Sequence, residues 1–330
     1  MSEPTRLFTR SDVERLLDIR SCISAVEAAF RLRGSGAASP SAALGVHVEG
    51  GGFHAKAAYL ELARPYFALK VNANFPGNPG AHSLPTIQGV LMLFDATRGV
   101  PVAVMDSAAI TTLRTAAASA VAADNLARPD AHTATFIGCG VQARAHVAAI
   151  SAIRDLRQVY VFDIDKERGS RFASELRERY AFSVTVAPGL RDATRASEII
   201  VTTTPANQPF LGADQVCPGA FVAAVGADNE HKRELELSLL REAAVVVDDT
   251  EQCATIGDLH HAIEAGVLTR EDVRATLAEV VAGSRPGRLR DDEIVVFDST
   301  GVAIEDVAAA SIVFERAALS GAGLAIHLRE

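Results

Sequence analysis

The feature that most constrains the fold of this 330-residue chain is a glycine-rich turn between an apolar strand and a helix. The apolar run Ala134 to Ile137 leads into Gly138-Cys139-Gly140-Val141-Gln142-Ala143, a G-x-G-x-x-A pattern. In such a pattern Gly138 permits the tight turn, Gly140 lets the backbone approach a pyrophosphate, and Ala143 allows close packing of the helix. The free N–H groups at the helix start, around Val141 and Gln142, favour an anion.

An acidic residue further along the chain separates a dinucleotide site from an ordinary turn of small residues. Asp163 stands 20 residues past Ala143, at the end of the next predicted strand, Val159 to Phe162. A carboxylate at this place accepts hydrogen bonds from the ribose hydroxyls and repels a 2′-phosphate. The spacing therefore predicts NAD(H) rather than NADP(H), while Lys166 and Arg168 are near enough in sequence to reduce that repulsion.

Strands and helices alternate from Thr133 onward, which predicts a parallel sheet covered on both faces. Several late strands end in small or polar residues: Thr202-Thr203-Thr204-Pro205, Gly226-Ala227-Asp228, Asp248-Asp249 and Asp298-Ser299-Thr300-Gly301. In open α/β sheets the ligand sits at the carboxyl ends of the strands. These segments are therefore expected to line one crevice.

The first third of the chain follows a different pattern. A helix is expected from Ser11, as its N-cap, to Leu32, and short strands are expected at 44–48, 53–60, 66–73 and 89–95. A helix rich in alanine is expected from Thr111 to Leu126. This part of the chain is predicted to be a small, mostly β region.

Composition and charge exclude several classes of protein. The net charge is −9, the pI is about 5.5 and the basic residues are scattered, which argues against nucleic acid and anionic membranes as partners. No apolar run reaches the ~18 residues of a membrane span, and the N-terminus carries no secretory signal. The four cysteines lack a C-x-x-C spacing and are interpreted as reduced thiols. We expect a cytoplasmic protein.

A second group of candidate residues lies in the mostly β region: His54, Lys56, Lys70, Asn78 and Arg114. Lys70 interrupts an apolar strand, and His54 and Lys56 point to one face of another because they are two residues apart. Any one of these side chains alone fits a solvated surface group. Together with the dinucleotide motif they predict a pocket for a small carboxylic acid.

Two further features carry opposite interpretations. Asp228 follows a predicted strand at the carboxyl edge of the sheet, where it is either a loop carboxylate or a proton donor beside a nicotinamide. His260 and His261 are adjacent and lack any recognised metal-ligand spacing, so they are interpreted as structural or interface histidines. The sequence predicts no metal site.

Across nearly its whole length the chain resembles the ornithine cyclodeaminase/μ-crystallin family. The resemblance is carried by ordered stretches: Leu69-Lys70-Val71, Phe75-Pro76-Gly77-Asn78, Leu84-Pro85-Thr86, Met105-Asp106, Leu113-Arg114-Thr115, Gly138-Cys139-Gly140, Val225-Gly226-Ala227-Asp228, Lys232 with Glu234-Leu235, Val247-Asp248-Asp249 and Phe297-Asp298-Ser299-Thr300-Gly301. It implies a Rossmann NAD-binding domain, 116–304, and a substrate-binding and dimerisation domain, 1–115 plus 305–330. It also implies NAD(P), a homodimer, and chemistry at the Cα–N bond of small amino acids.

The resemblance also implies roles for single residues. Lys70 is similar to the family's substrate-contacting lysine, Arg114 to the arginine near substrate and cofactor, and Asp228 to the catalytic carboxylate. His54, Lys56 and Asn78 are expected on the substrate side. The positions expected to line the cofactor are Thr86, Arg114, Gly138, Gly140, Val141, Gln142, Asp163, Thr204, Val225, Gly226, Lys232 and Ser299.

Two departures from the family pattern bear on the substrate. The basic residue that often follows the proline matching Pro40 is replaced by Ser41. His54 stands where the cyclodeaminases carry glutamate and the archaeal alanine dehydrogenases carry arginine, and Lys56 is an added cation. Either Lys56 replaces the lost cation, or it meets a second carboxylate on the substrate.

We therefore expect an NAD(H)-dependent amino-acid dehydrogenase or imine reductase of the archaeal alanine dehydrogenase pattern. Its reaction is either the reduction of iminosuccinate to aspartate or the conversion of pyruvate and ammonia to alanine. The alternatives are a cyclodeaminase that recycles bound NAD, a cyclic ketimine reductase, and a non-catalytic binding protein of μ-crystallin type. Intact Lys70 and Asp228 argue against the last.

Overall fold

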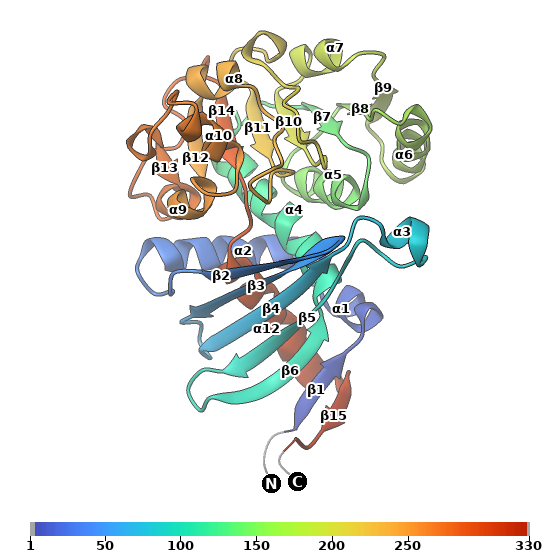
Figure 1. The fold of residues 1–330 in the computed structure, drawn as a ribbon, viewed down its shortest axis with the longest axis vertical. Coiled ribbons are helices and arrows are strands. Elements are labelled where there is room, and N and C mark those ends of the chain that lie inside the picture. The colour runs from blue at the N-terminus through green and yellow to red at the C-terminus, as the bar shows by residue number, and fades with distance from the viewer. Residues whose placement is uncertain (1–3, 329–330) are drawn as a thin grey trace. The chain divides into compact units, whose positions relative to one another are not determined.

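The computed structural model describes residues 4–328, and the chain divides into two compact units. Unit 1 comprises Met1–Ala117 and Val302–Glu330, and unit 2 comprises Ala118–Gly301. Each unit is built on one sheet (Figure 1). The predicted fold class, a Rossmann-like α/β sheet with a second sheet domain, is confirmed.

The sheet of unit 1 has seven strands in the order β15-β1-β6-β5-β4-β3-β2. Their bounds are β1 (Thr5–Phe8), β2 (Ala42–Val48), β3 (Gly51–Leu60), β4 (Tyr66–Asn74), β5 (Ile87–Asp95), β6 (Val100–Asp106) and β15 (Leu324–Ile326). Strands β2 to β6 form an antiparallel meander, β1 pairs with β6 in parallel, and β15 lies antiparallel to β1.

The first helical region of unit 1 differs from its prediction. Two helices, α1 (Arg10–Leu16) and α2 (Ile19–Gly34), replace the single helix expected from Ser11 to Leu32. The reason is Asp18, whose backbone is extended and whose side chain accepts a hydrogen bond from the Ser21 N–H at 2.9 Å, so a new helix begins there. Thr9, rather than Ser11, caps α1.

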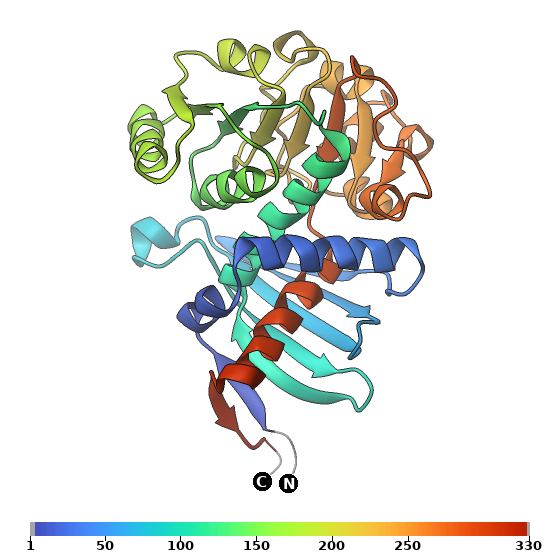
Figure 2. The same ribbon diagram turned by 180° about the vertical axis from the view of Figure 1, so that it is seen from behind.

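Helix α12 (Ala303–Ser320) covers one face of this sheet, with α2 packed against it (Figure 2). Side chains alternate between the two faces of each strand. Ala58, Leu91 and Leu93 are buried, whereas Val46, Phe53 and Val90 on the opposite face are 43 to 49% exposed. Helix α3 (Asn78–Ala81) lies between β4 and β5, and α4 (Ser107–Leu126) follows β6.

Unit 2 holds an eight-stranded parallel sheet in the order β13-β12-β14-β11-β10-β7-β8-β9. The strands are β7 (Thr133–Ile137), β8 (Gln158–Phe162), β9 (Ser183–Val186), β10 (Ile199–Thr202), β11 (Phe221–Ala224), β12 (Ala244–Val247), β13 (Ala275–Thr276) and β14 (Val295–Asp298). The helices after α4 are α5 (Val141–Ile153), α6 (Lys166–Arg179), α7 (Leu190–Arg195), α8 (Leu237–Glu242), α9 (Thr250–Cys253), α10 (Asp258–Glu264) and α11 (Leu277–Val281).

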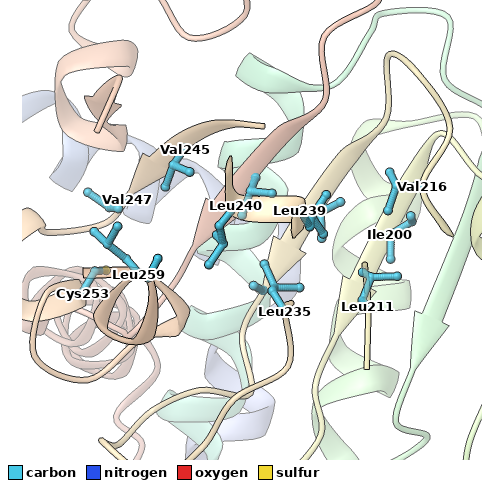
Figure 3. Close-up of a cluster of buried hydrophobic side chains, with 14 of the residues drawn as sticks. Ile200, Leu211, Val216, Leu235, Leu239, Leu240, Val245, Val247, Cys253 and Leu259 are labelled. Atoms are coloured by element: carbon cyan, nitrogen blue, oxygen red, sulfur yellow. The ribbon is translucent and has the colours of Figure 1, made fainter. Parts of the chain in front are cut away.

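Aliphatic side chains from strands and helices of unit 2 form one buried cluster (Figure 3). Ile200 and Val245 come from the sheet, while Leu239 and Leu259 come from α8 and α10. Burial of each such side chain stabilises the folded state by ~1.5–3 kcal/mol. The cluster thereby fixes α8 and α10 against the strands whose carboxyl ends carry the candidate cofactor residues. Within residues 4–328, no helix is both long and apolar enough to cross a membrane.

Candidate functional site

The glycine-rich turn of unit 2 has the geometry that a dinucleotide site requires. Gly138 has φ of +86°, and a Cβ there would lie 2.9 Å from the Thr203 carbonyl oxygen, so only glycine fits. Gly140 stands at the N-cap of α5, and a Cβ on it would meet nothing within 4 Å. The backbone at Gly140 is therefore open to an approaching phosphate, beside the first N–H groups of α5.

Asp163 lies at the end of β8, beside this turn. Its Oδ2 accepts a hydrogen bond from the Cys139 N–H at 2.8 Å, and its Oδ1 accepts one from the Asp165 N–H at 2.9 Å. These bonds fix the carboxylate while each oxygen keeps a lone pair for a hydroxyl. The Arg168 guanidinium comes within 3.7 Å of Oδ2 and is half exposed. Arg168 therefore lies where its positive charge would reduce the repulsion between the Asp163 carboxylate and a 2′-phosphate.

A fully buried glutamate, Glu234, ties the ends of β10 and β11 together. Its two oxygens accept hydrogen bonds from the Thr202 hydroxyl, from the N–H and hydroxyl of Thr204 and from the Gly226 N–H, at 2.5 to 2.8 Å. A Cβ on Gly226 would come within 2.5 Å of this carboxylate. Glu234 thereby holds two of the predicted cofactor-lining residues, Thr204 and Gly226, in place. Sequence reasoning assigned it no role.

Further buried carboxylates hold the same edge of the sheet. Asp258 accepts hydrogen bonds from the N–H groups of Glu234 and Leu235, and Asp298 accepts one from the Leu259 N–H. Burial, followed by repulsion from neighbouring carboxylates, raises the pKa values of both aspartates. Asp298 belongs to a strand-end segment that was expected to line the crevice, whereas its carboxylate braces the start of α10. No role was predicted for Asp258 from the sequence.

Two polar atoms of unit 2 favour a bound ligand. The Ser299 hydroxyl and the Gln142 side-chain oxygen are buried and have no hydrogen-bond partner among residues 4–328. A buried polar atom without a partner is costly unless a ligand or water satisfies it. Both residues belong to the set predicted to line the cofactor, and Val225, the remaining strand-end member, is buried beside Gly226. Together with the open backbone at Gly140, they fit a dinucleotide.

Asp228 lies in the loop after β11, and its side chain is half exposed. Its Oδ1 accepts a hydrogen bond from the Lys232 ammonium at 2.7 Å and a longer one from the Asn229 amide. Within the part of the chain that the structure describes, Oδ2 accepts no hydrogen bond. The pair with Lys232 therefore orients the carboxylate and leaves one oxygen for a reacting group or a water.

In unit 1, three of the predicted substrate residues, His54, Lys56 and Lys70, share one face of the sheet. Lys56 on β3 lies directly opposite Lys70 on β4, and His54 lies opposite Asn72 in the same register. Cross-strand partners lie on the same face, so these side chains share the face that α12 covers. The His54 ring also lies edge-on to the His47 ring of β2, with centroids 6.2 Å apart.

The cations Lys70 and Arg114 are held by two acidic residues of α12. The Lys70 ammonium lies 2.8 Å from Asp306, and Arg114 places Nη1 2.8 Å from Glu305 and Nε 3.1 Å from Asp306. All four side chains are buried. Burial, followed by repulsion from Arg114, lowers the pKa of Lys70 to about 7. Burial opposes ionisation of Asp306, but attraction by Lys70 and Arg114 prevails and lowers its pKa.

The remaining predicted residues of unit 1 hold local structure. The Asn78 amide donates to the Pro85 carbonyl at 3.3 Å, and the Thr86 carbonyl accepts from the Phe75 N–H at 2.9 Å, so both shape the loop around α3. Ser41, which replaces a basic residue of the family pattern, accepts the Ala303 N–H at 3.1 Å. Its hydroxyl thus helps to fix the start of α12, the helix that carries Glu305 and Asp306.

Comparison with protein-family models identifies the family of this chain. The model of the ornithine cyclodeaminase/mu-crystallin family matches residues 4–321. The chain belongs to this family. An alanine dehydrogenase of Archaeoglobus fulgidus is 39% identical over 319 residues, which cover 97% of both chains.

Two solved structures match almost the whole chain. One is an archaeal alanine dehydrogenase dimer with bound NAD, which is 38% identical, has a TM-score of 0.94, and is matched over 98% of this chain and 99% of that one. The other is the iminosuccinate reductase of Paracoccus denitrificans in complex with NAD+. It is 28% identical, has a TM-score of 0.89, and is matched over 98% of this chain and all of that one. The predicted family is thus confirmed, and these relatives are NAD-dependent oxidoreductases.

Proposed function

We propose that this protein is an NAD(H)-dependent oxidoreductase that interconverts a small 2-imino or 2-oxo acid and the corresponding amino acid. The observation that carries the proposal is the buried pair Lys70 and Arg114, fixed by Asp306 and Glu305 on a family scaffold with an intact dinucleotide turn. Two cations fixed in this way can bind a carboxylate without losing side-chain freedom at that moment.

Each residue then has a role in the proposed reaction. Lys70 and Arg114 bind the α-carboxylate of the substrate. The cofactor is bound by Gly138, Gly140, the start of α5 and Asp163. When bound, it supplies a hydride to the imino carbon. Asp228, oriented by Lys232, delivers a proton to the imine nitrogen directly or through an ordered water. Asp306 and Glu305 act by positioning the two cations.

Net consumption of cofactor separates this proposal from its alternatives. We expect one NADH to be oxidised for each amino acid formed when 2-oxo acids and ammonia, or preformed imines, are supplied. A cyclodeaminase would instead release ammonia from ornithine with no net change in NADH, since its cofactor is recycled. A binding protein would take up cofactor and ligand and produce neither change. Either result would overturn the proposal.

The geometry of Asp163 predicts the choice of cofactor. We expect kcat/KM with NADH to exceed that with NADPH by at least about tenfold, or ~1.4 kcal/mol, because a 2′-phosphate would meet this fixed carboxylate. Arg168→Gln should widen the ratio, since it removes the guanidinium 3.7 Å from Asp163. Steady-state rates with both cofactors measure the ratio. Equal use of the two cofactors by the parent enzyme would show the preference to be wrong.

The substrate is best matched by a single carboxylate, as in the imine of pyruvate. When Lys70 is protonated, as it is below pH 7, Lys56, Lys70 and Arg114 carry three positive charges, and Glu305 and Asp306 carry two negative ones. One substrate carboxylate therefore balances these five side chains. The runner-up is iminosuccinate, which the added cation Lys56 favours, and a relative of that activity shares the fold.

Lys56→Met distinguishes the two substrates. With a monocarboxylate substrate, we expect this variant to weaken activity toward pyruvate and ammonia and toward any dicarboxylate imine by similar factors. A selective loss of ~2–4 kcal/mol in transition-state binding for the dicarboxylate alone would instead assign Lys56 to a second carboxylate. Parallel measurements of kcat/KM on both substrate types provide the comparison.

We also propose a homodimer formed through the uncovered face of the sheet in unit 1. Val46, Phe53 and Val90 expose apolar side chains on this face, and an apolar patch on a sheet is a common site of protein–protein contact. A related structure is a dimer. Light scattering should give twice the chain mass, and Phe53→Glu with Val90→Glu should give monomers.

The four cysteines are free thiols, which supports a cytoplasmic location.

A further inference from the structure

A cluster of potential metal ligands lies on α10, apart from the residues assigned above. One ligand atom each from His260, His261 and Glu264 lies within 4.8 Å of the other two. Leu259 of the same short helix is buried in the core of unit 2 (Figure 3). Ala262 is buried in the same cluster, and the two side chains fix the helix. His260 and Glu264 are one helical turn apart and therefore share a face of α10.

Both imidazole rings are oriented by backbone carbonyls. His260 Nδ1 lies 3.2 Å from the Ala254 carbonyl oxygen, and His261 Nε2 lies 3.0 Å from the Lys232 carbonyl oxygen. A carbonyl oxygen can only accept, so each of these nitrogens carries the proton. In the neutral rings the lone pairs are then on His260 Nε2 and His261 Nδ1. Metal-binding histidines are typically oriented in this way, by donation from the other nitrogen to a carbonyl or carboxylate.

The third member makes the cluster attract a cation. Glu264 places an oxygen 3.5 Å from His260 Nε2, so in the neutral ring a carboxylate faces a nitrogen lone pair. That arrangement is repulsive unless a proton or a metal ion lies between the two atoms. A proton can join only this pair, whereas a metal ion can also be bound by the second imidazole, whose ring centroid lies 5.1 Å from that of His260.

We infer that His260, His261 and Glu264 form a binding site for a divalent transition-metal ion of the zinc class. Two imidazoles and one carboxylate are ligands that Zn²⁺ prefers, and three protein ligands leave a coordination position for water. Metal–ligand bonds of ~2.0–2.2 Å place tetrahedral ligands about 3.4 Å apart. The distance of 3.5 Å between His260 and Glu264 already matches this spacing. The ligand atom of His261, which lies within 4.8 Å of the other two, has to approach them by at most about 1.4 Å.

Lys232 connects this cluster to Asp228 within unit 2. The Lys232 carbonyl orients His261, and the Lys232 ammonium orients Asp228 at 2.7 Å. A metal ion bound by His261 would therefore restrain the segment that carries Asp228. Binding of the ion does not require the proposed redox activity.

Titration of the purified, EDTA-treated full-length protein with Zn²⁺ alone tests the inference. We expect one equivalent to bind and to raise the melting temperature. His260→Gln and Glu264→Gln, both on the helix surface, should each weaken this binding by at least about tenfold. The matched control is His231→Gln, which removes a histidine that faces Glu230 at 3.7 Å without a second imidazole, and it should leave the affinity unchanged.

Substitution with Co²⁺ identifies the ligands. The site predicts a visible spectrum of nitrogen and oxygen ligation, without the intense thiolate band that binding through a cysteine would give. Three outcomes would overturn the inference: no bound equivalent in the parent protein, an unchanged affinity in both His260→Gln and Glu264→Gln, or a thiolate spectrum. The first would mean that the His260–Glu264 contact is only a protonated ion pair.

Discussion

Asp306→Asn is expected to lower kcat/KM for the imino or oxo acid by at least about 100-fold, or ~2.7 kcal/mol. The carboxylate of Asp306 holds both cations, with the Lys70 ammonium at 2.8 Å and Arg114 Nε at 3.1 Å. An asparagine would leave Lys70 buried without its counter-charge. Since burial already lowers the pKa of Lys70 to about 7, the loss of Asp306 would lower it further and favour the neutral amine. A neutral amine binds a carboxylate poorly.

The pH dependence of ligand binding gives this prediction a direct measurement. In the folded protein Lys70 loses its proton as the pH rises through about 7, whereas in the unfolded chain it keeps the proton up to its usual pKa of 10.5. The affinity for a non-reacting carboxylate, measured with cofactor present, should therefore be highest below pH 7 and fall as the pH rises above 7. In Asp306→Asn the fall should begin at lower pH, and in Lys70→Arg it should disappear.

Two variants guard this prediction against simple misfolding. Breaking a buried ion pair costs ~3–5 kcal/mol of stability, so Asp306→Glu, which keeps the charge, should recover much of the activity. Asp95→Asn is the matched control, because Asp95 is a buried carboxylate of the same sheet that pairs with Arg64 and Arg98 away from Lys70. It should alter stability and leave the pH dependence of ligand binding unchanged. An unaltered pH dependence in Asp306→Asn would remove Asp306 from the site.

Asp228→Asn is expected to lower kcat by at least about 100-fold with NADH binding nearly intact. The amide keeps the shape of the carboxylate and can still accept from Lys232 and Asn229, but it cannot exchange a proton with the imine nitrogen or a water. Pre-steady-state reduction and the dissociation constant of NADH separate the two effects. Near-normal turnover would remove Asp228 from the mechanism.

A control variant for Asp228 lies in the same loop. Glu230→Gln removes the same charge two residues away, where the carboxylate faces the exposed His231. This variant should keep kcat within about twofold. A comparable loss in Glu230→Gln would mean that the general charge of the loop, rather than proton transfer at Asp228, is what the reaction requires.

The parts of the fold that the sequence predicted are those fixed by local chemistry. The turn from Gly138 to Ala143 needs a positive φ and a close backbone approach, and only small residues permit these, so the pattern is readable in the sequence. Strands β7, β10, β11 and β12 of unit 2 are buried on both faces and appear in the sequence as short apolar runs. The break between α1 and α2 cannot be predicted from the sequence, because Asp18 also fits the polar side of one continuous helix.

The parts that the sequence did not predict depend on contacts between distant segments. Strands β1 and β15 are only four and three residues long and are defined by pairing with each other across the length of the chain. Glu305 and Asp306 stand 191 and 236 residues from Arg114 and Lys70, their partners in hydrogen bonds. Two acidic residues in the first turn of a helix are common because they suit the helix dipole, so nothing in their local sequence separated them from ordinary helix starts.

The proposed function requires that hydride passes between the cofactor and the Cα of a small amino acid with a net redox change. The most direct measurement supplies NADH deuterated on the transferring side of C4, together with ammonia and pyruvate or a preformed imine. We expect deuterium at Cα of the amino acid formed and one NAD+ for each molecule of product. Product without deuterium, or ammonia released from ornithine with the NADH pool unchanged, would contradict it.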